Sequence, residues 1–156
     1  MKPNIDISDK NRGAVAELLN VLLADEYVLY TKTRNAHWNI EGNNFMELHK
    51  FFEGQYEAID ETIDSVAERV RSLGHYSLGS LKDFLEITHL SEDKELSDQK
   101  SALKALLESH ETIICNCRKD LVTINDKYKD LGTADFITGI MEEHEKMAWM
   151  LRSYLA

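Results

Sequence analysis

The chain has 156 residues, of which 43% are apolar and only one is proline, so it can form one domain with a hydrophobic core but lacks the turn residues of a small all-β fold. Its 18 Lys and Arg against 28 Asp and Glu give a net charge of −10, which argues against binding nucleic acid through general surface charge. It has neither an apolar run near the roughly 20 residues that span a bilayer nor an N-terminal secretory signal, so we expect a soluble, cytoplasmic protein without a membrane partner.

Hydrophobic periodicity predicts four long helices, and the first two cover residues 12–37 and 45–73. The turn 38–43 interrupts the pattern between them. Asn44 is placed to cap the second helix, and Gly74 suits the position just after its end. The second helix would be about 43 Å long, which is long for a globular domain.

The rest of the chain predicts a connector followed by two more long helices. The less regular segment 77–95 contains one short helix near residues 81–85. The third long helix covers residues 97–128, and a last helix, capped by Thr133, reaches residue 156.

This order of elements predicts an all-α fold, a ferritin-like four-helix bundle with a short extra helix in the crossover between the second and third helices. We expect residues 1–156 to form a single domain of this type, with residues 1–11 as a short N-terminal tail.

Cys115 and Cys117 form an isolated Cys-x-Cys in the third long helix. A zinc site would need about two further ligands nearby, and there is no second cysteine pair. Positions i and i+2 lie about 200° apart on a helix, so we expect no disulfide between them. The pattern indicates two small, partly buried thiols in a reducing compartment.

Candidate metal ligands gather on the second long helix. At about 100° per residue, five acidic and imidazole side chains form one polar ribbon along one face: His49, Glu53, Asp60, Asp64 and Glu68. His49 with Glu53, and Asp64 with Glu68, are i, i+4 pairs whose members can bind one cation together. Imidazole combined with carboxylate suits iron, zinc or manganese.

The ribbon is too long to be a single site within one chain. His49 and Asp64 are about 22 Å apart along the helix axis, whereas the ligands of one metal lie within a few ångströms of each other. A second copy of the helix, packed antiparallel about a two-fold axis, would place the His49 end of one chain opposite Asp64 and Glu68 of the other. This arrangement gives two equivalent sites per dimer, and His37 could supply another nitrogen.

The alternative is that the ribbon is only the solvated face of a long helix, with His37 packed beside Trp38. The four remaining histidines have no evident set of metal partners, and we expect them to be structural or exposed: His75, His89, His110 and His144. The single Glu-x-x-His, Glu86 to His89, falls in the connector rather than on a long helix, which disfavours a centre inside one bundle.

The pattern H-x11-H-x3-[DE]-x10-D-x3-E is met by His37, His49, Glu53, Asp64 and Glu68. With the flanking AHWN and AER sequences and the ending MAWMLRSYLA, it closely resembles the Dps family, dodecameric mini-ferritins named as DNA-binding proteins from starved cells. The resemblance covers nearly the whole chain.

The resemblance implies an iron-storage protein that protects against oxidative stress. At an inter-subunit ferroxidase centre it would oxidise Fe(II) to Fe(III), with hydrogen peroxide preferred over oxygen, and store the ferric mineral in a hollow shell. His37 and His49 of one chain would bind iron together with Asp64 and Glu68 of its two-fold mate. Glu53 stands where many members have Asp, and its longer side chain could shift a second, weaker iron position.

The resemblance also suggests roles for residues around the centre. Trp38 would intercept oxidising equivalents or serve as a packing aromatic. In related shells, acidic residues near the start of the last helix line pores, so Asp130 and Asp135, and less strongly Asp126, are candidates for iron entry. The alternative for these residues is helix capping.

Family members that bind DNA directly often carry a Lys-rich terminal extension. Here the first twelve residues mix three basic side chains with two acidic ones, and twelve chains would carry a net charge of about −120. We therefore expect DNA binding to be weak or absent, and we rank a DNA-compacting protein of the same fold below the ferroxidase. A surface adhesin or immune-stimulating oligomer is a third class that the sequence does not test.

Overall fold

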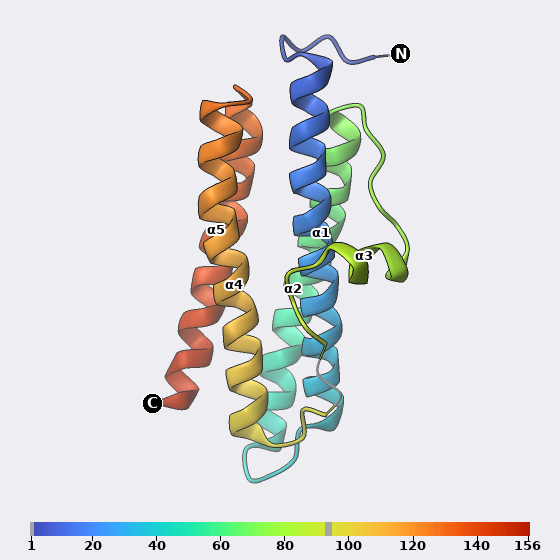
Figure 1. Ribbon diagram of the computed structural model, residues 1–156. Helices are drawn as coiled ribbons and strands as arrows, with labels where there is room; N and C mark the ends of the chain where they lie inside the picture. Colours follow the sequence, from blue (N-terminus) through green and yellow to red (C-terminus); the bar gives the residue numbers. More distant parts are fainter. Residues whose placement is uncertain (1, 93–94) are drawn as a thin grey trace.

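The computed structural model describes residues 2–92 and 95–156 (Figure 1). Over these residues the chain forms five helices and no strand. They are α1 (Asp9–Asn39), α2 (Phe45–Ser72), α3 (Leu81–Ile87), α4 (Gln99–Asp126) and α5 (Leu131–Leu155).

The four long helices form two antiparallel pairs, α1 with α2 and α4 with α5, which pack side by side as a bundle (Figure 1). The crossover from α2 to α4 runs back along the bundle, so α2 and α4 point the same way, and α3 lies within this crossover against α1. This confirms the predicted all-α, ferritin-like bundle with a short extra helix between the second and third long helices.

α2 shows how the sequence pattern determines which face is buried. Its buried residues recur at intervals of three or four: Leu48, Phe52, Gln55, Ile59, Thr62, Val66 and Val70. This spacing forms one inward stripe along the whole helix. The acidic residues Asp60, Asp64 and Glu68 are exposed outside that stripe, so the polar ribbon is available to solvent or to another chain.

Two helix starts differ from the sequence prediction because capping side chains precede them. α1 begins at Asp9, inside the predicted tail 1–11, because the Ser8 hydroxyl accepts a hydrogen bond from the Asn11 N–H at 3.2 Å. The prediction that Thr133 caps the last helix is wrong. Asp130 is the cap, and it accepts from the Thr133 N–H at 2.9 Å.

Two other predicted helix ends are confirmed. Asn44 precedes α2 as its N-cap residue, although its side chain makes no capping hydrogen bond. Gly74 follows α2 with a φ of +88°, and a Cβ there would lie 2.7 Å from the ring of Pro3. Both the left-handed backbone and the close approach of Pro3 therefore require glycine.

Asp25 on α1 fixes the crossover to the bundle. Its buried carboxylate accepts hydrogen bonds from the Thr88 hydroxyl at 2.7 Å and from the His89 backbone N–H at 2.6 Å. The His89 imidazole Nδ1 lies 2.9 Å from its second oxygen. The His89 imidazole thus contacts Asp25, whereas Glu86 forms an ion pair with Lys82, so Glu86 and His89 do not act as a joint metal motif.

The two cysteines are free thiols on different faces of α4, as their spacing predicts. Cys115 is exposed and Cys117 is buried. Burial is the main cause that raises the pKa of the Cys117 thiol, followed by the negative charge of Glu26, so this thiol stays protonated. Within the described part of the chain, no helix combines the length and apolarity needed to cross a bilayer.

Candidate metal centre

His37 and His49 meet where α1 ends and α2 begins. Their imidazole rings stack with centroids 3.7 Å apart and an interplanar angle of 17°. His37 is buried and His49 is half-buried. Both residues were predicted as ligands of one metal site, and the turn after α1 brings them side by side.

Each imidazole is held by the backbone of the other residue. His37 Nδ1 lies 2.7 Å from the carbonyl oxygen of His49, and His49 Nδ1 lies 2.8 Å from the carbonyl oxygen of His37. A carbonyl oxygen only accepts, so each Nδ1 carries the proton and donates it. In the neutral rings, both Nε2 atoms are therefore unprotonated, which is the tautomer that a metal-binding histidine needs.

Aromatic side chains surround this histidine pair. Phe45 stacks on His49 and Tyr56 meets His37 edge-on, each with centroids 5.2 Å apart. Desolvation, followed by the negative charge of Glu53, raises the pKa of the Tyr56 phenol. Its phenol therefore remains a neutral group beside His37.

Trp38 lies on the outer side of the pair and is 66% exposed. The guanidinium of Arg34 lies 5.4 Å from the Trp38 ring centroid and 4.4 Å from the Tyr56 centroid. Trp38 is therefore a surface aromatic stacked against a cation rather than part of the core.

The acidic half of the predicted site is not near the histidines in a single chain. Asp64 and Glu68 lie four to five turns further along α2, about 22 Å or more from His49, and both are exposed. Among residues 2–92 and 95–156, no group of three or more His, Cys, Asp or Glu is close enough to hold a metal ion. One chain brings together His37 and His49, with Glu53 one turn away, but not the other two predicted ligands.

The predicted pore acids differ in their surroundings. Asp130 is 2% exposed, accepts from the backbone and hydroxyl of Thr133, and lies 3.5 Å from the Arg69 guanidinium. Asp135 is exposed in the first turns of α5, and Asp126 is exposed at the end of α4. Asp130 is therefore already engaged in holding the start of α5 to α2, whereas Asp135 is accessible.

A buried polar chain in the bundle core was not predicted as a unit. Glu26, His110 and His144 come from α1, α4 and α5, and none is more than 1% exposed. The two histidines are structural, as expected, but nothing predicted that they contact each other and Glu26. The signal for Glu26 was its place on the inward stripe of α1, four residues after Leu22 and three before Leu29.

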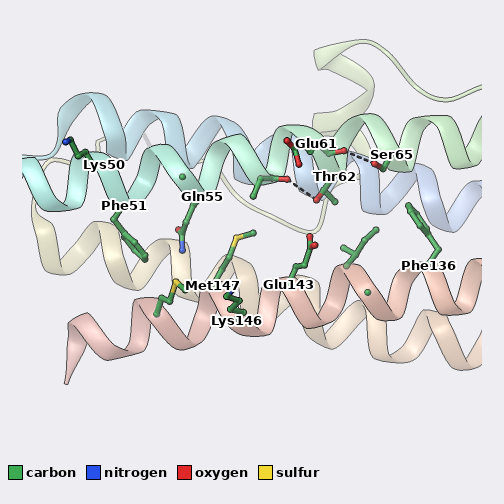
Figure 2. Close-up of a pocket in the computed structure, with 15 residues that line it drawn as sticks. Lys50, Phe51, Gln55, Glu61, Thr62, Ser65, Phe136, Glu143, Lys146 and Met147 are labelled. Carbon is green, nitrogen blue, oxygen red and sulfur yellow. Dashed lines mark hydrogen bonds between the residues drawn. The ribbon is translucent and has the colours of Figure 1, made fainter.

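A separate groove of about 690 Å³ lies between α2 and α5 (Figure 2). Phe51 and Met147 form part of its apolar wall, and the Gln55 side chain points into it from α2. Glu61 and Glu143 line it from opposite helices. None of the predicted iron ligands is among its described lining residues, so this groove is distinct from the histidine pair.

Comparison with known proteins agrees with the fold and the sequence pattern. Residues 16–156 match the ferritin-like domain family. A low temperature-induced protein of Nostoc sp. is 44% identical over 97% of this chain and 86% of its own length. DNA protection during starvation protein 2 of Bacillus anthracis is 35% identical over 90% of this chain and 96% of its own length.

Solved structures show the same relationship. A Dps protein from Vibrio cholerae O1, described as a member of a superfamily of ferritin-like diiron-carboxylate proteins, has a TM-score of 0.93 and 30% identity, covering 100% of this chain and 98% of its own. DpsC from Streptomyces coelicolor has a TM-score of 0.94 and 29% identity, covering 100% of this chain and 91% of its own. The chain therefore belongs to the ferritin-like domain family and, within it, to the Dps proteins.

Proposed function

We propose that this chain is an iron-storage mini-ferritin that oxidises Fe(II) at centres shared between two subunits. The observation that carries the proposal is the tautomer of the histidine pair: His37 and His49 both donate from Nδ1 to backbone carbonyls and leave Nε2 available for a metal. Membership of the Dps proteins, and the diiron-carboxylate description of the Vibrio cholerae relative, support iron as the metal.

The distribution of ligands along α2 supports a shared rather than an internal centre. The histidines lie at one end of the helix, while Asp64 and Glu68 lie about 22 Å or more away on an exposed face. An antiparallel partner about a two-fold axis would bring the acids of one chain to the histidines of the other. The proposed assembly is a homo-oligomer of such dimers, extended to a dodecameric shell.

The ligand set suits oxidation of bound ferrous iron. Carboxylates are hard ligands that favour Fe(III) over Fe(II), and two imidazoles with two carboxylates leave coordination positions open for the oxidant. Two Fe(II) ions each give up one electron, and one hydrogen peroxide accepts both and becomes two hydroxide ions. Oxygen can replace peroxide as the electron acceptor, and the Fe(III) product is then stored as a hydrated oxide.

Two neighbouring residues have proposed supporting roles. Glu53 lies one turn from His49 and would contribute a carboxylate to a second, weaker iron position. Trp38 stacks on Arg34 beside the pair and would take up oxidising equivalents that escape from the centre. For iron entry we propose Asp135, which is accessible, with Asp130 holding the start of α5 in place.

We propose that DNA binding is weak at neutral pH and that the protein works in the cytoplasm. Of the three basic residues near the N-terminus, Arg12 is 5% exposed and the exposed Lys2 pairs with Asp9 at 2.9 Å, so this end offers only a small positive charge to phosphate. The net charge of −10 per chain would repel DNA as well. A tight band shift with duplex DNA at about 0.15 M salt would contradict this part of the proposal.

The test is anaerobic addition of Fe(II) and hydrogen peroxide, followed by the appearance of ferric absorbance. The variant Asp64→Ala with Glu68→Ala is expected to lose the fast oxidation phase, because the acidic half of each centre is gone. Glu57→Ala with Glu61→Ala removes two exposed acids at the same spacing on the same helix and is the matched control. Equal rates in the wild type and the Asp64/Glu68 variant would overturn the proposed centre.

A further inference from the structure

The seam between the two helix pairs of the bundle contains a hydrogen-bonded chain of three ionisable side chains. His144 Nε2 on α5 lies 2.8 Å from Glu26 Oε1 on α1, and His144 Nδ1 lies 2.8 Å from His110 Nδ1 on α4. The exposed fractions of Glu26, His110 and His144 are 0%, 0% and 1%. The bond between Glu26 and His144 therefore links α1–α2 to α4–α5 in the absence of solvent.

The geometry fixes how many protons the chain can hold. With Glu26 as a carboxylate, which only accepts, His144 Nε2 must carry a proton. The two Nδ1 atoms at 2.8 Å require one N–H and one lone pair, so they share a single proton. With both rings neutral, His144 carries its proton on Nε2 and donates it to Glu26, and His110 carries its proton on Nδ1 and donates it to His144 Nδ1.

A further proton has no hydrogen-bonded position in the closed chain. The two Nδ1 atoms have room for one proton between them, so an added proton creates an N–H at His110 Nε2 or an O–H at Glu26 Oε2, and each of these atoms is buried without a hydrogen-bond partner among the described residues. Burial first, and then the neighbouring His144, hold the pKa of His110 well below its usual range.

The other titratable groups that face the core do not supply a counter-charge to His110. On α1, Asp25 is bonded to Thr88 and His89, and the Lys32 ammonium, itself a cation, donates to Ser109. The remaining buried titratable groups of α1 are Arg12 and His37.

The other four helices also supply no buried counter-charge to His110. On α4, Cys117 is a buried neutral thiol, and the half-buried Asp120 has a pKa raised by its own burial. The buried positions of α2 and α3 contain no titratable side chain, and on α5 His144 is the one buried titratable group. Glu26 is therefore the carboxylate bonded to this chain, and His144 already occupies one of its oxygens.

We propose that Glu26, His144 and His110 form a latch across the bundle seam, closed when both histidines are neutral and released when the three side chains take up one further proton. Since the closed form disfavours protonated His110, it is fully stable above the ordinary imidazole pKa and loses stability as the pH falls below it. The population of the open form is expected to rise about tenfold for each pH unit below about 6.5, which corresponds to uptake of one proton.

The test is hydrogen exchange, read by mass spectrometry, on the assembled, metal-free protein between pH 7.5 and pH 5. Protection of the peptides around His110 and His144, corrected for the intrinsic exchange rate, is expected to fall about tenfold per pH unit below about 6.5. His110→Gln retains an amide that can donate to His144 but does not titrate, so this pH dependence should disappear. Glu108→Gln removes an exposed titratable group two residues from His110 on α4 and should leave it unchanged.

The latch is overturned if wild-type protection is flat down to pH 5, or if His110→Gln shows the same pH dependence as the wild type. Glu26→Gln covers the case in which His110→Gln does not fold. It keeps an acceptor oxygen for His144 and leaves His110 in place, so the tenfold loss of protection per pH unit below about 6.5 should persist, and a flat profile in this variant also contradicts the latch. These measurements use no iron, so they are independent of the proposed ferroxidase function.

Discussion

The molecule contains two histidine pairs, and the contrast between them lies in what each ring nitrogen contacts. In His37 and His49, both Nδ1 atoms donate to backbone carbonyls at the ends of α1 and α2, which leaves Nε2 for a metal. In His110 and His144, the Nδ1 atoms face each other in the core, and one Nε2 is bonded to Glu26. The same residue type thus forms a structural link in the core and is proposed as a metal ligand at the helix ends, depending on burial and on its hydrogen-bond partners.

The contrast also separates activity from stability. Substitutions in the His37 pair should mainly change iron oxidation, because they remove the two Nε2 atoms that we propose bind the metal. Substitutions in the His110 pair should mainly change the free energy of unfolding, because they leave a polar or charged group buried without its partner.

The largest effect is expected from His37→Ala combined with His49→Ala. Loss of a residue that only supports a metal ligand already costs about 10–100-fold, so removal of both nitrogen ligands should slow ferroxidation on the order of 100-fold. The rate is measured by stopped-flow ferric absorbance with peroxide. His110→Gln at pH 7.5 is the control and should keep the wild-type rate; a twofold or smaller loss in the His37/His49 variant would refute the division of roles.

Next in size is the effect of His144→Leu on stability. It leaves the Glu26 carboxylate buried and unpaired, which should lower the free energy of unfolding by about 3–5 kcal/mol. Adding Glu26→Leu removes this unpaired carboxylate and should restore a large part of the lost free energy of unfolding. Urea titrations of both variants give the comparison, and a double variant as unstable as His144→Leu alone would show that the charge is not the cause.

Smaller effects are expected at the two predicted pore acids, on stability for Asp130 and on iron uptake for Asp135. Asp130→Ala removes the cap of α5 and should cost about 1–2 kcal/mol of stability. Asp135→Ala touches an exposed carboxylate, so it should change the free energy of unfolding by less than about 0.5 kcal/mol while slowing iron uptake into the assembled protein. An unchanged uptake rate in Asp135→Ala would remove this residue from the entry path.

The smallest effect on stability is expected at Trp38. This side chain is 66% exposed and its ring lies against Arg34, so Trp38→Phe should change the free energy of unfolding by less than about 0.5 kcal/mol. Its proposed role is instead tested with a radical trap in solution during iron oxidation. The yield of trapped radicals should increase in Trp38→Phe relative to the wild type, because fewer escaping oxidising equivalents are taken up by the protein. A large loss of stability would show that Trp38 is a packing residue.

The sequence predicts the helices well because apolar periodicity is a local signal. Gly74 and Asn44 were placed correctly, since a helix end needs particular residues within one turn. The last helix start was placed three residues late because both Asp130 and Thr133 are good caps, and the choice depends on the contact between Asp130 and Arg69 of α2. The local pattern of apolar residues cannot predict such a contact between helices that are far apart in the sequence.

For the polar sites too, some features could be predicted from the sequence and others could not. His37 and His49 could be paired from their helix ends, and the length of α2 alone separates Asp64 from them. The Glu26–His144–His110 chain could not be foreseen as a unit, because it depends on how three helices are rotated about their axes in the bundle.

The central claim, that each centre draws its histidines and its acids from different chains, is tested most directly by mixing two inactive variants. One carries His37→Ala and His49→Ala, and the other carries Asp64→Ala and Glu68→Ala. After the two are denatured and reassembled together in equal amounts, half of the dimers are mixed and each of these regains one of its two centres, so about a quarter of the wild-type centres should return. Recovery of peroxide-dependent ferroxidation to about that level supports shared centres, whereas no recovery in a mixture shown to contain mixed dimers would contradict them.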